Sequence, residues 1–311
     1  MTEIVLVHGV AQQQKAAALL AAALIPALAG GIENARDQLP QDARQLADTL
    51  VSRIKSGVVT VVPAFYGALF LEPRLETNDE KEFADSFAAA WLKAASERDL
   101  NGRVGRAATH AADELRQIHA VGQAQGAGHL LGQAIQAFSK VPGLGKVLIG
   151  GATKLVPTLA QVTKYMLDQA VQQTIRDSVR RLITPDTRVL IGHSLGSIVA
   201  YDVARTMDQH LPLLLTLGSP LGLHTVVYEK LNPQPPAFPE RVGRWVNIAD
   251  REDYIASTSD LRPLFSTGKP AHARFDNVAS VNNGDEPHAL DRYLTKPETG
   301  LALLEALIPL L

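Results

Sequence analysis

The amino-acid sequence predicts an α/β fold, in which a mostly parallel sheet has helices on both faces and carries a large helical insertion. Apolar runs such as Ile4–Val7 and 189–191 lack the alternation of half-buried strands, which is typical of parallel strands covered on both faces. Helical patterns separate these runs. A serine flanked by glycines, Ser194, stands where one apolar run meets a helical pattern. These three observations indicate a parallel sheet that displays a nucleophile at one edge.

The length and composition favour one domain with an insertion over two small domains. The chain has 311 residues, of which 46% are hydrophobic, and this is enough to bury a large core. We predict the α/β core at residues 1–75 and 184–311 and a helical cap at 76–183. Structureless connections longer than about 15 residues are uncommon in compact domains, so the inserted segment is expected to be folded.

Composition and motifs exclude several functional classes. The net charge of −2 and the lack of an aromatic-basic motif argue against nucleic acid as a partner. The chain has no cysteine, which excludes disulfides, thiolate metal sites and cysteine nucleophiles. The glycines between 126 and 151 do not match a dinucleotide-binding fingerprint, and Val147 follows Lys146 where a phosphate-binding loop needs Ser or Thr. We therefore expect no cofactor and no metal.

The N-terminal segment shows no secretory signal, because it has neither a basic region nor a small-residue cleavage site. We therefore expect a cytoplasmic protein. Residues 16–32 carry no charge, but this run is short for a membrane span and is interrupted by Pro26 and Gly30. It is predicted to form a helix buried against the sheet.

The first predicted unit consists of a strand at Ile4–Val7, helices at about 12–29 and 41–55, and a strand at 58–62. His8, Gly9 and Val10 follow the first strand at its C-terminal end, where open parallel sheets bind their ligands. At that position the backbone N–H of Val10 is a candidate donor to a developing oxyanion. The alternative interpretation is a plain strand-end turn, with His8 packed in the core.

The segment around Ser194 predicts a strand, a tight turn and a helix. Glycines two residues before and after the serine, Gly192 and Gly196, let the strand and helix pass without a side-chain clash. The turn holds the hydroxyl out for attack, and the backbone N–H of Leu195 at the helix N-terminus is a second candidate oxyanion donor. The alternative is a structural glycine turn.

After the Ser194 turn we predict strands at 213–217, 245–249 and 275–281, and a C-terminal helix at 301–310. A serine hydroxyl needs a base within hydrogen-bond reach and a carboxylate that orients the base. His288 follows the last predicted strand and is the candidate base, the alternative being a surface histidine. His193 is a weaker candidate, because a neighbour of the serine in such a turn points away from the reacting side.

Three acids follow the 245–249 strand: Asp250, Glu252 and Asp253. Asp253 is favoured as the orienting carboxylate, because an acid a few residues beyond the strand can reach under the imidazole of His288. Asp250 is better placed to cap the turn. Glu252 is the third candidate.

Five segments, VLVHGV, GHSLGS, LLTLGSPLG, WVNIADREDYIA and PHALDRYL, occur in this order along the chain. Over about 1–65 and 185–311 the chain resembles the α/β-hydrolase-fold serine esterases and lipases. Position by position, the resemblance implies a catalytic triad and a pair of oxyanion donors, namely Ser194, Asp253 and His288, with the backbone N–H groups of Val10 and Leu195. Residues 63–71 resemble poorly characterised bacterial hydrolases.

Two features depart from that family. The chain begins at what resembles the family's third strand, so the usual first hairpin is missing, and the 76–183 insertion resembles no cap that we can assign. We expect a serine hydrolase that cleaves carboxylic esters through an acyl-enzyme. The alternatives are a catalytically silent binding protein with the same fold, and an amide or peptide hydrolase using the same triad.

The insertion bears on the substrate class. Residues 140–181 contain seven basic and two acidic side chains, namely Lys140, Lys146, Lys154, Lys164, Arg176, Arg180 and Arg181 against Asp168 and Asp177. Apolar residues lie between them: Val147, Leu148, Ile149, Leu155, Val156, Leu159, Val162 and Met166. One interpretation is a peripheral contact with an anionic membrane that admits a lipid ester. The other is an apolar stripe packed over the sheet with solvated lysines.

Overall fold

The computed structural model describes residues 2–10, 12, 15–71, 74–99, 102–122, 152–256, 258 and 260–308. Within these ranges a six-stranded parallel sheet has the order β2-β1-β3-β4-β5-β6. Its strands are β1 (Ile4–Val7), β2 (Val61–Ala64), β3 (Val189–His193), β4 (Leu211–Leu217), β5 (Val242–Asp250) and β6 (Arg274–Val281). The predicted α/β class with a parallel sheet is confirmed.

Two apolar layers bury the two faces of the sheet. Alternate residues of β1 show the division, since Ile4 and Leu6 belong to one cluster and Val5 and Val7 to the other. The first cluster includes side chains of α1 (Ala17–Ala35), α2 (Gln41–Lys55), α11 (Leu290–Leu294) and α12 (Pro297–Leu307). The second includes side chains of α7 (Ala152–Leu167), α8 (Gln169–Arg180), α9 (Leu195–Arg205) and α10 (Arg262–Phe265). Both faces are covered, which is why the strands are apolar at successive positions.

The chain reverses its direction across the sheet between β1 and β3. From β1 it passes outward to β2, and it then returns to form β3 on the other side of β1. Ligands of open parallel sheets bind outside the carboxyl ends of the strands at such a reversal. The register pairs Val7 with Gly192, so the ends of β1 and β3 lie side by side at this point.

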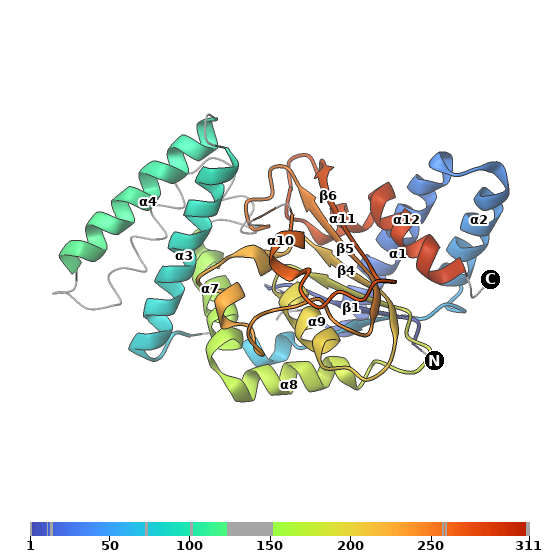
Figure 1. The fold of residues 1–311 in the computed structure, drawn as a ribbon, viewed down its shortest axis with the longest axis horizontal. Helices are drawn as coiled ribbons and strands as arrows, with labels where there is room; N and C mark the ends of the chain where they lie inside the picture. The colour runs from blue at the N-terminus through green and yellow to red at the C-terminus, as the bar shows by residue number, and fades with distance from the viewer. Residues whose placement is uncertain are drawn as a thin grey trace.

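The connection from β2 to β3 contains η2 (Gly67–Phe70), α3 (Asn78–Arg98), α4 (Arg103–Gly122), α7 and α8. Figure 1 shows α3 and α4 at one end of the molecule, with α1, α2 and α12 at the other end and the sheet between them. α3 packs against α4 and α7, whereas α8 packs against α9. Buried residues of α3 such as Phe87 and Trp91 belong to the same apolar cluster as residues of the sheet. The division into a core and a separate 76–183 cap stays a prediction.

Two early boundaries differ from the sequence prediction. The second strand is 61–64 rather than 58–62, because the turn after α2 uses Gly57 in the left-handed region (φ 76°) and leaves Val58 59% exposed. The first helix extends to Ala35 and contains Pro26. Pro26 lies on the exposed side of the helix, where the carbonyl that loses its N–H partner can be hydrated.

α1 forms most of Ala17–Gln38, the one segment in the described ranges that is long and apolar enough to cross a membrane by length and composition alone. Its buried residues include Leu24, Leu28 and Ile32, which pack in the apolar cluster on one face of the sheet. Core helices of globular domains pass the same composition test, so this segment is weak evidence for a membrane span.

Candidate active site

The turn between β3 and α9 holds Ser194 in a strained conformation. Its φ of 54° and ψ of −128° make it the only non-glycine residue with positive φ in the described part of the chain. Such backbone costs about 1–3 kcal/mol and persists only where the surrounding structure enforces it. The Ser194 N–H donates to the Leu217 carbonyl at the end of β4 (3.1 Å), which fixes the turn against the next strand.

The glycines around the serine are required by close backbone approaches. A Cβ on Gly192 would lie 2.6 Å from the Ser197 Cα and 2.5 Å from the Gly196 carbonyl oxygen. A Cβ on Gly196 would overlap the backbone at the end of β1, including the carbonyl carbon of Val7 at 2.8 Å. Real Cβ contacts are almost never this short. The helix after Ser194 can therefore start directly against β3 and β1 only because these positions are glycine.

The end of β1 lies directly beside Ser194. A Cβ on Gly9 would approach the Ser194 Cβ to 2.8 Å. Leu195 is the first residue of α9, and the first N–H groups of a helix have no intrahelical acceptor. The two sequence-predicted oxyanion donors, the N–H groups of Val10 and Leu195, thus belong to two segments that meet at the serine.

His8 is a buried, neutral histidine. Its Nδ1 lies 2.6 Å from the Gly9 carbonyl, and its ring stacks on Tyr66 with 4.2 Å between ring centroids. Burial is the main cause that lowers the pKa of His8 to about 4, against the Gly9 hydrogen bond, which raises it. His8 is therefore packed in the core, as the alternative interpretation of this turn predicted, and the role of the Val10 N–H stays a prediction.

His288 and Asp253 form a buried hydrogen-bonded pair. The His288 Nδ1 lies 2.8 Å from the Asp253 Oδ2, and the side chains are 5% and 0% exposed. Because Nδ1 must be the donor to a carboxylate, the neutral ring has an unprotonated Nε2. This Nε2 is buried and has no hydrogen-bond partner. His288 is therefore not a surface histidine, and its free nitrogen is a proton acceptor.

All the acceptor positions of the Asp253 carboxylate are used for orientation. The Tyr293 hydroxyl donates to Oδ2 at 2.6 Å, and the Ile255 N–H donates to Oδ1 at 3.0 Å. Burial alone would raise the pKa of Asp253, but the charge and hydrogen bond of His288, the Tyr293 hydrogen bond and the Arg98 charge lower it below the usual value. The carboxylate is thus kept ionised in a buried position.

Asp250 has a different set of contacts. Its Oδ1 accepts from the Glu252 N–H at 2.6 Å, and its Oδ2 accepts from the Asn283 N–H. These bonds cap the turn after β5 and tie it to the loop after β6. Glu252 is exposed. Of the three candidate acids, the structure brings only Asp253 to His288.

Gly218 and His193 complete the packing around the pair. Gly218 has a φ of 53°, and a Cβ there would lie 2.6 Å from the Asp253 Oδ2 and 3.1 Å from the His288 Nδ1. The His193 Nε2 lies 2.9 Å from the His288 carbonyl oxygen, and burial is the main cause that lowers the pKa of His193 to about 3. His193 is therefore a neutral donor that holds the backbone of His288.

No hydrogen bond joins the Ser194 hydroxyl to the His288 Nε2, although both residues are described. The two residues are linked through the end of β4: the Ser194 N–H donates to the Leu217 carbonyl, and the next residue, Gly218, lies against Asp253 and His288. Nucleophile and base contacts are often long until a substrate binds.

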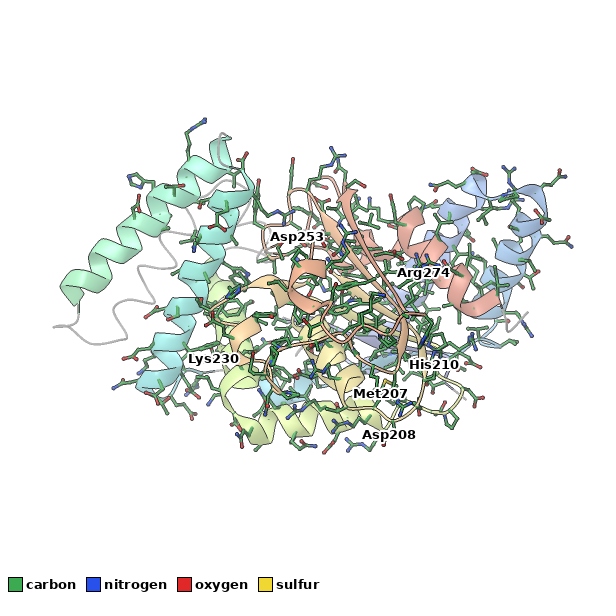
Figure 2. The ribbon with its side chains drawn as sticks, in the orientation of Figure 1. Met207, Asp208, His210, Lys230, Asp253 and Arg274 are labelled. Atoms are coloured by element: carbon green, nitrogen blue, oxygen red, sulfur yellow. The ribbon has the colours of Figure 1, made fainter. Side chains whose placement is uncertain are left out.

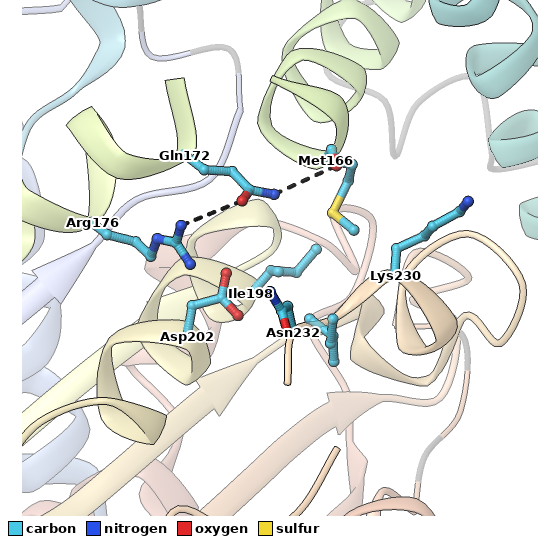
Figure 3. A pocket seen from close by; sticks show the side chains of 8 residues that line it. Met166, Gln172, Arg176, Ile198, Asp202, Lys230 and Asn232 are labelled. Atoms are coloured by element: carbon cyan, nitrogen blue, oxygen red, sulfur yellow. Dashed lines mark hydrogen bonds between the residues drawn. The ribbon is translucent and has the colours of Figure 1, made fainter. Parts of the chain in front are cut away.

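A separate hollow lies between α7, α8 and α9 and contains the side chains of Arg176 and Asp202 (Figure 3). Its volume of about 20 Å³ is close to the space that one water molecule needs. The Tyr165 hydroxyl donates to the Asp202 Oδ2 at 2.6 Å and joins α7 to α9. Ser194 does not line this hollow, which is too small for an ester substrate.

The basic segment 140–181 is described only in part. Lys140 and Lys146 lie outside the described residues, as do Val147, Leu148 and Ile149. Lys164 pairs with Glu80 on α3 at 2.7 Å. Leu159, Val162 and Met166 of α7 are buried in the core cluster, whereas Leu167 at its end is exposed.

Two residues that contact the candidate pair escaped the sequence analysis. Tyr293 lies five positions after His288, and nothing in the local pattern marks its hydroxyl as a partner of Asp253. Arg98, at the end of α3, donates to the carbonyls of Asp250, Arg251, Asp253 and Ala256. A contact over 155 positions has no signal in a single sequence.

Comparison of the chain with models of known protein families, with curated proteins and with solved structures finds no match. The candidate site therefore has to be interpreted from its own geometry.

Proposed function

We propose that this protein is a serine hydrolase that cleaves carboxylic esters, with Ser194 as nucleophile, His288 as general base and Asp253 as the orienting acid. The observation that carries the proposal is the buried His288–Asp253 hydrogen bond of 2.8 Å, beside a serine held at positive φ. Strained nucleophile turns of this kind, with a base oriented by a carboxylate, are typical of acyl-transfer enzymes.

The reaction follows from these contacts. The Ser194 Oγ attacks the ester carbonyl carbon and passes its proton to the His288 Nε2, while the N–H groups of Val10 and Leu195 donate to the oxyanion. The protonated His288 then gives that proton to the leaving alcohol oxygen, and the C–O bond breaks to leave an acyl-serine. A water molecule, deprotonated by His288, attacks the acyl-serine carbonyl carbon. The protonated His288 then returns this proton to the Ser194 Oγ as the acyl C–O bond breaks, which releases the carboxylic acid and the free enzyme.

The proposal extends to membership of the α/β-hydrolase superfamily. It is supported by a parallel sheet in which the serine follows β3, the acid follows β5 and the histidine follows β6. The carboxyl ends of parallel strands share one edge, so three residues far apart in the chain can meet there. A binding protein without activity would not need an ionised, fully hydrogen-bonded Asp253 under an unpartnered imidazole nitrogen.

A fluorophosphonate probe together with a series of p-nitrophenyl esters tests the proposal. We expect the probe to label Ser194 and turnover to depend on acyl length, because only a serine activated by a base reacts readily. Ser194→Ala should abolish both labelling and turnover. Ser197→Ala is the matched control. The Ser197 hydroxyl lies within α9 and donates to the Ser194 carbonyl, so it is not the group expected to react, and the Ser197→Ala variant should still be labelled at Ser194. Labelling that survives in Ser194→Ala would disprove the assignment.

A further inference from the structure

Arg98 joins the insertion to the loop that carries the candidate acid. It is the last residue of α3, and it donates to four backbone carbonyls of the 250–256 loop. Nη1 donates to the Asp253 carbonyl and, at 3.0 Å, to the Ala256 carbonyl. Nη2 donates to the Asp250 carbonyl at 2.8 Å and to the Arg251 carbonyl at 3.2 Å. One guanidinium thus gathers most of the carbonyls of this loop.

The loop leaves the strand ladder after Arg251, whose N–H still donates to the Val281 carbonyl, and Arg98 adds donors to the turns that follow. After β5 ends at Asp250, the described residues up to Ala256 form only turns. Converging carbonyl oxygens repel one another unless a cation or several donors lie between them. A guanidinium is suited to this role, since its donors are held in a rigid planar fork, whereas an ammonium is a point charge on a flexible stem.

α3 presents Arg98 from a fixed support. The helix begins with a capping box between Thr77 and Glu80, and Glu80 also pairs with Lys164 of α7 at 2.7 Å. Phe87 and Trp91 bury its middle turns in the core cluster. At its C-terminal end, the Arg98 Cζ lies 6.0 Å from the centre of the Tyr254 ring, within the range of a cation–π contact.

The position of the loop determines the position of the Asp253 carboxylate. Its Oδ1 is held by the N–H groups of Ile255 and Ala256, which belong to the clamped loop. Asp253, labelled in Figure 2, lies beside the C-terminal end of α3, because its backbone carbonyl accepts from Arg98. A displacement of about 1 Å in a catalytic group costs about 10²-fold in rate. A shift of this loop would move the Asp253 carboxylate relative to His288 and slow the reaction.

We propose that Arg98 is a positioning residue, through which the insertion holds the 250–256 loop and thereby keeps Asp253 under His288. The inference rests on the proposed function, and it gives the insertion a role in positioning the candidate acid. Arg98 acts through Asp253 and is not itself a reacting group.

Kinetics of Arg98→Gln, Arg98→Lys and Arg98→Ala test the inference. We expect kcat for the best ester to fall about 10²-fold in Arg98→Gln, with KM within about twofold of the wild-type value, because the acid and not the substrate is displaced. The kcat of Arg98→Lys should lie between the values of the wild type and Arg98→Gln. Millimolar guanidinium should restore part of kcat in Arg98→Ala, since it can occupy the vacated site. Lys93→Gln is the matched control, because it removes a charge from an exposed position of the same helix and should leave kcat unchanged.

A proton NMR measurement separates this inference from the proposed function. The His288 Nδ1–H that bonds to Asp253 should give a far-downfield resonance, which is identified by its loss in Asp253→Asn. We expect it to shift or broaden in Arg98→Gln and to persist in Lys93→Gln. If the wild-type protein hydrolyses no ester, the proposed function fails and the resonance still tests Arg98. An unchanged resonance in Arg98→Gln overturns the inference, and so does a loss of kcat that guanidinium does not restore in a folded Arg98→Ala.

Discussion

Asp253 and Asp250 stand three residues apart, yet their carboxylates are bound differently. Asp253 accepts from His288 and Tyr293, whereas Asp250 accepts only from backbone N–H groups of Glu252 and Asn283. A carboxylate bound to the imidazole fixes its tautomer and stabilises its protonated form, while one bound to backbone groups stabilises a turn. Substitution of Asp253 should therefore lower the activity, whereas substitution of Asp250 should lower the stability of the fold.

We expect Asp253→Asn to lower kcat by about 10⁴-fold in a folded protein, because the amide favours the wrong tautomer of His288. Asp250→Asn should keep most of the activity and lower the unfolding free energy instead, by about 1–2 kcal/mol for the weakened turn. Ester kinetics and urea denaturation of both variants measure the two effects. If Asp250→Asn were the more damaging to kcat while still folded, the orienting role would belong to Asp250.

Asp85 is a buried carboxylate without a partner. The residue on α3 is 1% exposed, and neither carboxylate oxygen has a hydrogen-bond partner. Burial, followed by the charge of Glu82, raises the pKa of Asp85 from 3.8 to about 7. The folded state therefore binds a proton more readily than the unfolded state between these values, and stability falls as the pH rises from about 4 to 7.

Asp85→Asn should remove this pH dependence, since the amide resembles the neutral acid in shape. We expect the variant to be about 1–2 kcal/mol more stable than the wild type at pH 8, with the difference shrinking as the pH falls through 7 toward 4. Urea denaturation at pH 8, 6 and 5 measures the trend. A gain that is equal at all three values would mean that charge burial is not its cause.

At the scale of elements, α1 crosses the C-terminal helices at a point where only glycine fits. A Cβ on Gly31 would overlap the Leu294 carbonyl of α11 and lie 3.3 Å from the Lys296 carbonyl oxygen. A Cβ on the neighbouring Gly30 would meet only the Thr295 Cγ2, at an ordinary 3.8 Å. The two adjacent glycines therefore lie in the same helix, but only Gly31 is packed tightly against another backbone.

This difference predicts opposite effects of the same substitution. Gly30→Ala should raise the unfolding free energy by about 0.5–1 kcal/mol, because alanine loses less conformational entropy in a helix. Gly31→Ala should lower it by about 1–3 kcal/mol, because the backbone of α11 has to shift. Thermal or urea unfolding of the two variants checks the prediction. Stabilisation by both would show that α1 does not approach α11 so closely.

At the scale of the whole molecule, the 140–181 segment bears on whether a lipid or a soluble ester reaches Ser194. On α7, Leu159, Val162 and Met166 are buried and Leu167 is 39% exposed. Lys164 pairs with Glu80. Among the described side chains of the 140–181 segment, Leu167 is the one exposed large apolar residue, so these side chains form no continuous apolar stripe. Peripheral membrane contact through the insertion remains a proposal that depends on the residues outside the described ranges.

We expect the protein to stay in the supernatant with anionic vesicles at both low and physiological salt, and to prefer short soluble esters. The physical reason is that interfacial binding requires an exposed apolar face as well as basic side chains. Vesicle co-sedimentation, with neutral vesicles as the control, measures the binding. Salt-dependent pelleting with anionic vesicles alone, together with a preference for long acyl chains, would favour a lipid ester as substrate.

The sequence alone was sufficient for the features that depend on neighbouring residues. The unalternating strands, the helices between them and the glycine-flanked turn at Ser194 were predicted because burial on both faces and backbone strain leave local patterns. The order of strand ends also predicted that Ser194 and His288 share one edge of the sheet. Strand limits were less well predicted, since the start of β2 depends on how the turn at Gly57 closes.

Only the tertiary structure decided which distant groups meet. The pairing of Asp253 rather than Asp250 with His288 depends on how the 250–256 loop folds back, and the contacts of Tyr293 and Arg98 join segments whose separation leaves no periodic signal. The order of the strands was likewise set by packing, because two apolar strands of equal length are interchangeable by pattern. Local steric and hydrophobic constraints act between residues a few positions apart. Hydrogen bonds between distant side chains instead depend on how the folded backbone brings them together.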